Sequence, residues 1–359
     1  MIKVGSDFSG VGAFNQALMR LGIEYDEVFA CDMDKYARET FIHNYGEPKY
    51  YPKDVYEREI PTERLDIYMT SPPCQAFSLA GKRLGKDDKR GILFFNSHEF
   101  IKTNKPRYFI FENVKGLLSD DNGNTFQEWV NMLGGKSVNG LPVLFPYEDS
   151  VPYHIYYQVM NAKKHGVPQN RERVFIIGIR DDEDNTFRWA KEEHLTKRLK
   201  DVLENDVDEK YFLSEDGIRN LQINQKYNKF NPLDEQSECT NTITSRCNKV
   251  SNDNPFFKVT QLNKSIESGG KQPYQQNRVY DVNGINPALN SGQHYWGGNI
   301  VNTQQIRRLT PRECFRLMDF PDTFTWTCSD SQAYKQAGNS IVVRCLELII
   351  KEFNLNATL

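Results

Sequence analysis

Short apolar runs alternate with amphipathic stretches through the first 180 residues, and this alternation constrains the fold more than any other feature of the chain. The pattern is typical of a parallel sheet, because two parallel strands need a long crossover that is usually a helix. Six apolar runs are predicted as strands, at 2–4, 28–31, 67–70, 108–111, 156–160 and 174–179. We therefore expect an α/β fold with a doubly wound, mostly parallel sheet.

Helices are predicted where apolar residues recur on one helical face. They do so from 13 to 21, where Gly22 follows as a stop. Further helical segments are expected at 93–101, 309–318 and 341–353. The segment at 309–318 contains Thr310-Pro311, an N-cap residue followed by a proline suited to the first turn. Glycines and prolines between 134 and 153 predict a surface insertion.

The sequence changes character after Arg180, where the periodic pattern becomes irregular until about 305. Residues 217–308 hold 11 Lys and Arg against 6 Asp and Glu, together with 25 Asn and Gln. Asn and Gln can read adenine and Arg can read guanine, so the segment suits base reading, although a polar solvated surface would have the same composition. We predict a first domain at 1–185, an inserted smaller domain with a hinge at 186–325, and a C-terminal segment at 326–359 that completes the first domain.

The composition suits a globular chain without a membrane span, because 38% of the residues are hydrophobic, 26% are charged, and no apolar run reaches 18 residues. The seven cysteines are odd in number and include no C-x-x-C pair, which argues against a zinc site and against a secreted disulfide framework. We therefore expect that the protein binds no metal and that it resides in a reducing cytoplasm. The first residues predict a strand, not a signal peptide, and leave no room for a large N-terminal regulatory domain.

A cysteine stands on a proline-stiffened loop in Ser71-Pro72-Pro73-Cys74, directly after the third predicted strand. The prolines stop regular structure because they lack the N–H that a sheet or helix needs. A lone cysteine is usually a small core residue, so Cys74 gains weight only with partners. Enzymes that methylate exocyclic amines carry an aromatic residue at this place in a similar segment. A thiol there suits addition to C6 of a cytosine, which makes C5 reactive.

Charged side chains stand at the ends of other predicted strands. Glu112 follows the fourth strand, and parallel neighbours deliver their carboxyl ends to one edge, so Glu112 is expected near Cys74. A glutamate there can hydrogen-bond N3 and the amine of a cytosine. Arg171 and Arg173 share one face at period two, so one can contact a base while the other organises the loop. Taken singly, each of these charges has an ordinary reading as a solvated loop residue.

Two glycines in Gly10-Val11-Gly12 lie between the first strand and the first helix, where the backbone can approach a ligand, or simply turn. The third glycine of a dinucleotide-binding pattern would fall at Asn15 and is absent, which disfavours a nicotinamide oxidoreductase. Asp32 ends the second strand, a place where an acid either holds ribose hydroxyls or is merely solvated. Asp54 follows the next apolar stretch and is a candidate contact for an adenine edge.

Taken in order, these segments resemble the cytosine-C5 DNA methyltransferase family over most of the chain. The likeness runs through residues 8–12, 73–75, 112–114, 169–173, 308–314 and 336–340. It is strongest to the small bacterial and phage enzymes of restriction-modification systems. The resemblance implies a Rossmann-like catalytic domain with a target-recognition domain at roughly 190–305. It also implies methyl transfer from S-adenosylmethionine to C5 of a cytosine in a specific double-stranded DNA sequence, with the base flipped out of the helix.

The resemblance assigns roles to individual residues. Cys74 matches the nucleophile, Glu112 the base-activating acid and Arg173 the base-contacting arginine, with Arg171 beside it. The cofactor pocket is matched by Phe8, Gly10, Gly12, Asp32, Met33, Asp54, Val55, Pro73, Leu93, Asn339 and Ile341. The DNA-contacting loop is matched by Gln75 and Ser78, and its basic residues Lys82, Arg83, Lys89 and Arg90 are expected to reach phosphates.

Ala13 and Met33 depart from the family, which often has a glycine and a larger aromatic residue at these places. The implied partners are double-stranded DNA and, where one exists, a restriction endonuclease that acts on the same site without a stable complex. We expect a monomer in the cytoplasm of a prokaryotic or phage-infected cell. Two alternatives stay open: a tRNA-cytosine methyltransferase of the same fold, and a catalytically silent DNA-binding module, which the set of Cys74, Glu112 and Arg173 disfavours.

Overall fold

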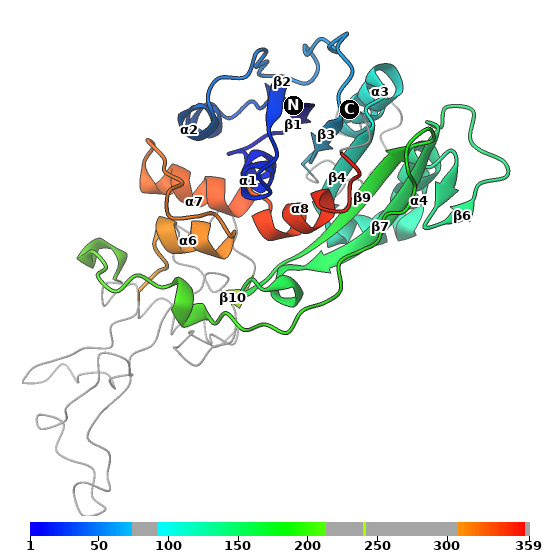
Figure 1. Ribbon diagram of the computed structural model, residues 1–359. Coiled ribbons are helices and arrows are strands. Elements are labelled where there is room, and N and C mark those ends of the chain that lie inside the picture. The colour runs from blue at the N-terminus through cyan, green and yellow to red at the C-terminus, as the bar shows by residue number, and fades with distance from the viewer. Residues whose placement is uncertain (74–91, 213–239, 242–306, 356–359) are drawn as a thin grey trace, which may run out of the picture.

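The computed structural model describes residues 1–73, 92–212, 240–241 and 307–355 (Figure 1). The strands are β1 (Ile2–Asp7), β2 (Tyr25–Cys31), β3 (Ile67–Thr70), β4 (Tyr108–Val114), β5 (Ser137–Val138), β6 (Leu141–Pro142), β7 (Tyr153–Asn161), β8 (Gln169–Asn170), β9 (Glu172–Arg180) and β10 (Thr240–Asn241). The α-helices are α1 (Ala13–Arg20), α2 (Lys35–Tyr45), α3 (Ile92–Asn104), α4 (Asn124–Leu133), α6 (Pro311–Leu317), α7 (Asp330–Asn339) and α8 (Val343–Ile350). Short 3₁₀ helices are η2 (Lys115–Gly123), η3 (Ala162–His165), η4 (Leu199–Val202) and η5 (Glu209–Tyr211).

Eight strands form one sheet in the order β2-β1-β3-β4-β9-β7-β5-β6. The first four are parallel to one another, whereas β9 runs antiparallel to both β4 and β7. The connection from β7 to β9 spans only residues 162–171, which is too short for the crossover that a parallel pair needs. The α/β fold with a mostly parallel sheet is therefore confirmed. Strand β9, between β4 and β7, runs in the opposite direction to both neighbours.

Helices cover both faces of this sheet (Figure 1). On one face, Val4, Ile67 and Ile110 share a buried cluster with residues of α1, α6, α7 and α8. On the other face, Phe29 and Phe109 share a second cluster with residues of α3 and α4. Successive side chains of a strand point to opposite faces, so strands covered on both sides read as continuous apolar runs. This burial explains why the strands were recognisable in the sequence.

The helices differ more from the sequence prediction than the strands do. Three helices, α2, α4 and α7, lie where none was predicted, and the last helix is shorter than the predicted 341–353. The N-cap prediction at Thr310 is confirmed: its hydroxyl accepts from the Glu313 N–H, and the Glu313 carboxylate accepts from the Thr310 N–H at 2.8 Å. Pro311 occupies the first turn, where its missing N–H costs no hydrogen bond.

Two chain segments flank residues 213–306 and are joined to each other. Phe212 and Arg307 form an antiparallel bridge, and the Arg308 N–H donates to the Tyr211 carbonyl at 2.9 Å. The described strand β10 pairs in parallel with β8, directly ahead of Arg171. The domain boundaries predicted above stay a prediction. Within the described ranges, no helix is long and apolar enough to cross a membrane.

Candidate active site

A cavity of about 670 Å³ opens at the carboxyl ends of β1, β2, β3 and β4. Ligands of open α/β sheets bind at this edge. Its lining includes ten of the eleven residues predicted for a cofactor: Phe8, Gly10, Asp32, Met33, Asp54, Val55, Pro73, Leu93, Asn339 and Ile341. Glu112, Arg171 and Arg173 line the same cavity. The tertiary structure thus brings the described members of both predicted sets together.

The two glycines after β1 differ in their surroundings. Gly10 has φ +55°, and a Cβ added there would meet nothing within 4 Å, so its backbone lies open to the cavity. Gly12 has φ +82°, and a Cβ there would lie 2.3 Å from the ring of Tyr45. Of the described residues predicted for the cofactor pocket, Gly12 alone is absent from the lining. Its glycine is explained by the turn and by close packing against α2.

Asp32 joins the Gly10 segment to the turn that precedes α2, at the wall of the cavity. Its carboxylate accepts from the Gly10 N–H and from the Asp34 N–H, each at 2.8 Å. Burial raises the pKa of Asp32, and these two N–H donors act to lower it. Asp34 caps α2 through the N–H groups of its first turn and forms an ion pair with Lys335 of α7. The carboxylate of Asp32 is therefore fixed at the cavity with part of its accepting capacity free for a ligand.

Glu112 and Arg173 face each other because β4 and β9 are antiparallel, which brings the end of one strand to the start of the other. Arg173 Nε lies 3.1 Å from Glu112 Oε1. Burial raises the pKa of Glu112, whereas Arg173 and then Arg171 lower it. Burial thus favours the neutral form of this carboxyl, and a protonated carboxyl can donate a hydrogen bond.

Arg171 has a different environment from Arg173. It is 3% exposed, and its Nη2 donates to the carbonyls of Gly338 at 3.1 Å and Ser340 at 2.7 Å. Burial, followed by the charge of Arg173, lowers the pKa of Arg171 to about 9. Its guanidinium thus holds the end of α7, where Asn339 lines the cavity, while Arg173 carries the charge beside Glu112. Arg171 thus organises backbone near the cavity, whereas a contact of Arg173 with a base stays a prediction.

The loop that carries the predicted nucleophile is described as far as Pro73. Pro72 is buried, and its carbonyl accepts from Asn113 Nδ2 at 3.1 Å, which ties this segment to β4. Cys74 lies outside the described residues, but it is bonded to Pro73, which lines the cavity. The predicted DNA-contacting residues also lie outside them: Gln75, Ser78, Lys82, Arg83, Lys89 and Arg90.

Three of the lining residues that were not predicted from the sequence help to define this site. Ser6 lines the cavity, is 1% exposed, and its hydroxyl has no hydrogen-bond partner among the residues that the structure describes. Asn113 holds Pro72, and its position directly after Glu112 was the available signal. Lys335 lies at the mouth beside Asp34 and had no signal beyond its nearness in sequence to Asn339.

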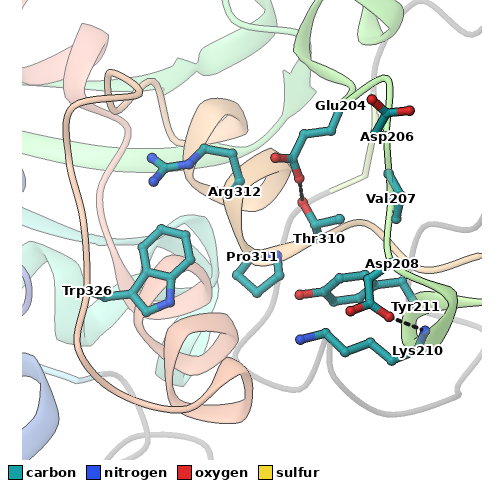
Figure 2. A pocket seen from close by; sticks show the side chains of 10 residues that line it. All are labelled: Glu204, Asp206, Val207, Asp208, Lys210, Tyr211, Thr310, Pro311, Arg312 and Trp326. Atoms are coloured by element: carbon teal, nitrogen blue, oxygen red, sulfur yellow. Dashed lines mark hydrogen bonds between the residues drawn. The ribbon is translucent and has the colours of Figure 1, made fainter.

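A second cavity, of about 360 Å³, lies at the start of α6 beside η5 (Figure 2). The Arg312 guanidinium stands 4.7 Å from the centre of the Trp326 ring on one side. On the other side, the Thr310 hydroxyl donates to Glu204, and the Asp208 carboxylate accepts from the Lys210 backbone N–H at 2.9 Å. Its polar groups already contact one another, and it contains none of the predicted site residues.

Comparison with known proteins places this geometry in a family. Residues 2–354 match the family described as C-5 cytosine-specific DNA methylase. The orphan methyltransferase M.SPRI of Bacillus phage SPR is 33% identical, over 98% of this chain and 97% of that protein. The type II methyltransferase M.HhaI of Haemophilus parahaemolyticus is 32% identical, over 98% of this chain and 93% of that protein.

Solved structures share the fold at lower identity. The Dnmt2 methyltransferase of S. pombe superimposes with a TM-score of 0.66 at 18% identity, over 98% of this chain and 97% of the other. A mutant of the DNMT2 of Spodoptera frugiperda gives 0.69 at 19%, over 98% and 99%. These likenesses support the α/β fold and carry no argument about substrate.

Proposed function

Because the chain belongs to the C-5 cytosine-specific DNA methylase family, we propose that it transfers a methyl group from S-adenosylmethionine to C5 of cytosine in a specific double-stranded DNA sequence. Family membership makes the chain a DNA cytosine-5-methyltransferase. The observation that supports the finer proposal is one cavity that combines Glu112, Arg173 and ten predicted cofactor residues, among them Pro73, to which Cys74 is bonded. We also propose that it serves a restriction-modification system or acts as a phage or orphan enzyme.

The residues of the cavity fit S-adenosylmethionine. The Ser6 hydroxyl is buried without a partner in the described part of the chain, and such groups in native proteins are normally satisfied by a ligand or water. Gly10 offers open backbone, and Asp32 retains accepting capacity for ribose hydroxyls. Asn339 and Ile341 would hold the cofactor from the α7 side, with Phe8 and Val55 as apolar walls. When bound, S-adenosylmethionine supplies the electrophilic methyl group that an activated C5 accepts.

The protein's own groups activate the cytosine. The Cys74 thiolate forms a bond to C6, and the electron pair of the C5–C6 double bond moves toward C5. Glu112, with its raised pKa, donates a hydrogen bond to N3 and stabilises the charge that develops on the ring. Arg173 keeps Glu112 in place and adds positive charge next to the ring. Once C5 carries the methyl group, the C5 proton passes to a solvent water, its bonding electrons restore the C5–C6 double bond, and the thiolate leaves C6, which gives 5-methylcytosine.

DNA contacts belong to two further parts of the proposal. C5 and C6 are inaccessible in a stacked duplex, so the target base must be flipped into the cavity. Gln75 and Ser78 are proposed to belong to the loop that contacts DNA around the flipped base. The basic residues of that loop are proposed to neutralise phosphates: Lys82, Arg83, Lys89 and Arg90. The target-recognition domain is proposed to read the surrounding bases. We further propose a cytoplasmic monomer whose cognate endonuclease, where one exists, acts on the same site without a stable complex.

The first test maps 5-methylcytosine at single-base resolution on the plasmid from which the protein is expressed. A methylated short sequence supports the proposal and gives the target site. An unmethylated plasmid from a folded protein contradicts it. Incubation of the purified protein with labelled S-adenosylmethionine and either duplex DNA or tRNA separates the two substrates, and label in tRNA alone would overturn the DNA assignment.

The second test uses a duplex with 5-fluorocytosine at the mapped position. Expulsion of the thiolate requires the loss of a proton from C5, and fluorine at C5 takes the place of that proton. The covalent adduct with the protein should therefore persist after denaturation. Cys74→Ala should abolish the adduct. Cys328→Ala is the matched control, since that thiol does not line the cavity, and it should leave the adduct intact. An adduct that survives in Cys74→Ala would refute this nucleophile.

A further inference from the structure

A buried polar network lies on the far side of β1 from the cofactor cavity. Ser6 and Asp7 are neighbours on β1 and therefore point to opposite faces of the sheet. Ser6 lines the cavity, whereas the Asp7 side chain is 0% exposed and lies 2.9 Å from Nε of Arg58, whose side chain is 2% exposed. The Tyr68 hydroxyl of β3 donates to the other Asp7 oxygen at 2.6 Å. None of these three side chains belongs to the cavity lining.

We propose that Asp7, Arg58 and Tyr68 are positioning residues that hold the walls of the cofactor cavity in register. The inference rests on the cofactor site of the proposed function. Its basis is that each member stands close in sequence to a segment that lines the cavity. A network that joins the three therefore fixes the relative placement of those segments.

The sequence distances are short. Asp7 is followed directly by Phe8, which lines the cavity at φ 58°. A non-glycine residue keeps this left-handed conformation only when its neighbours are firmly held. Tyr68 lies three residues before Ser71, which lines the cavity and whose hydroxyl donates to the Phe8 carbonyl at 3.4 Å. The Asp7 contact thus joins the two strand ends that carry Phe8 and Ser71.

Arg58 links two further segments that line the cavity to this network: the segment at 54–57 and helix α3. It follows a turn in which the Glu57 N–H donates to the Asp54 carbonyl at 3.2 Å, and Asp54 and Val55 both line the cavity. Arg58 Nη2 donates to the Asn96 carbonyl of α3 at 3.4 Å, one turn beyond the lining residue Leu93. The segment at 54–57 has no strand or α-helix to hold it, so Arg58, together with the buried Val55 side chain, attaches it to the sheet.

An ion pair at this place is better explained by position than by stability. Two charges removed from water lose about as much hydration energy as they regain by attraction, so an apolar pair would stabilise the fold as well. The surroundings are apolar: the Arg58 guanidinium lies 4.7 Å from the Phe100 ring centre, and the Tyr68 ring stacks on Phe100 at 4.1 Å. In such an environment a charged pair tolerates little displacement, because the attraction between the charges is strong and no water replaces it when they separate.

The test replaces Arg58 with Met, which keeps length and apolar volume but removes the charge. The matched control is Arg107→Met: Arg107 is buried, pairs with Glu183 at 2.9 Å and Asp66 at 3.1 Å, and lies at the opposite end of β4 from the cavity. Both variants lose a buried arginine pair, so both should lower the melting temperature. Only Arg58→Met should disturb the cavity.

Two measurements distinguish the variants. In hydrogen–deuterium exchange without cofactor, Arg58→Met should speed exchange at 53–57 and 8–12 by about 10-fold, while Arg107→Met leaves both unchanged. In calorimetric titration with S-adenosylhomocysteine, Arg58→Met should raise the Kd by about 10-fold and Arg107→Met should not. Equal exchange at these segments in the two variants would overturn the network.

Two controls keep the answers separate. If Arg58→Met does not fold, Tyr68→Phe decides, because it keeps the ring stacking and removes only the hydroxyl that donates to Asp7. Faster exchange at 53–57 and 8–12 in Tyr68→Phe supports the network, and unchanged exchange refutes it. Failure of the wild type to bind S-adenosylhomocysteine would contradict the proposed function, and the exchange measurement would still decide the network.

Discussion

Replacement of Glu27 by Gln should remove a large part of the pH dependence of stability. Glu27 is partly buried on β2, where one carboxylate oxygen accepts from Asn15 Nδ2, whereas Oε1 is buried without a hydrogen-bond partner within the described ranges. Burial raises the pKa of Glu27 from 4.5 to about 8, against the opposing effect of the Asn15 hydrogen bond. The folded state therefore keeps a proton on Glu27 at a pH where the unfolded state has lost it.

The sign and size follow from proton linkage. Between the unfolded pKa and the raised folded pKa, the folded state binds more protons, so the free energy of unfolding falls as pH rises. At about 1.4 kcal/mol for each pH unit, the loss from Glu27 between pH 5 and pH 8 is about 3 kcal/mol. With an unfolding entropy of about 2.1 cal/mol/K per residue, this corresponds to about 4 °C in the melting temperature. The Gln amide carries no proton to lose, and it can donate to Asn15 Oδ1, which is buried without a partner.

Thermal unfolding of wild type and Glu27→Gln at pH 5, 6, 7 and 8 checks this reasoning. The two proteins should differ little at pH 5, and the variant should be more stable by about 4 °C at pH 8. Other buried acids contribute equally to both proteins, so only the difference between the curves reports on Glu27. Glu24→Gln is the control, because Glu24 is exposed just before β2, and it should track the wild type. Parallel curves for wild type and Glu27→Gln would refute the argument.

Three further predictions concern the candidate site. Arg173→Met should abolish methyl transfer because Glu112 loses its charged partner, whereas Arg171→Met should lower the melting temperature further because two buried carbonyls lose their donor; activity assays and melting scans on both variants check this. Gly12→Ala should destabilise the fold, since φ is +82° and the new Cβ would lie 2.3 Å from the Tyr45 ring, and a melting temperature equal to that of the wild type would contradict this. Met33→Phe should tighten binding of S-adenosylhomocysteine, because Met33 is 80% exposed at the cavity and a ring would stack on adenine; calorimetric titration measures the change.

The sequence predicted the strands and the edge of the sheet at which the site lies. The run at 67–70 matches β3, and the Glu112 carboxylate does lie at the end of β4 as expected from the strand pattern. The strand prediction succeeded because strands buried on both faces have a continuous apolar pattern that is local in the sequence. The three unpredicted helices show the limit of that method. α7, for instance, is mostly small and polar, and packing against the sheet through Ala333, Tyr334 and Ala337 makes it a helix.

Residue types and their order also determined which chemistry the chain can perform: a thiol after two prolines, a glutamate near the end of β4, and two arginines at the start of β9, one directly before it and one within it. Only the tertiary structure decided how they meet. Because β9 runs antiparallel to β4, its first residues reach the edge where β4 ends, and Arg173 pairs with Glu112; a parallel β9 would have placed Arg173 at the opposite edge. Burial, which raises the pKa of Glu112, likewise depends on segments far apart in the sequence. Strand pattern is a local property, whereas pairing, burial and electrostatic environment arise only when distant segments pack together.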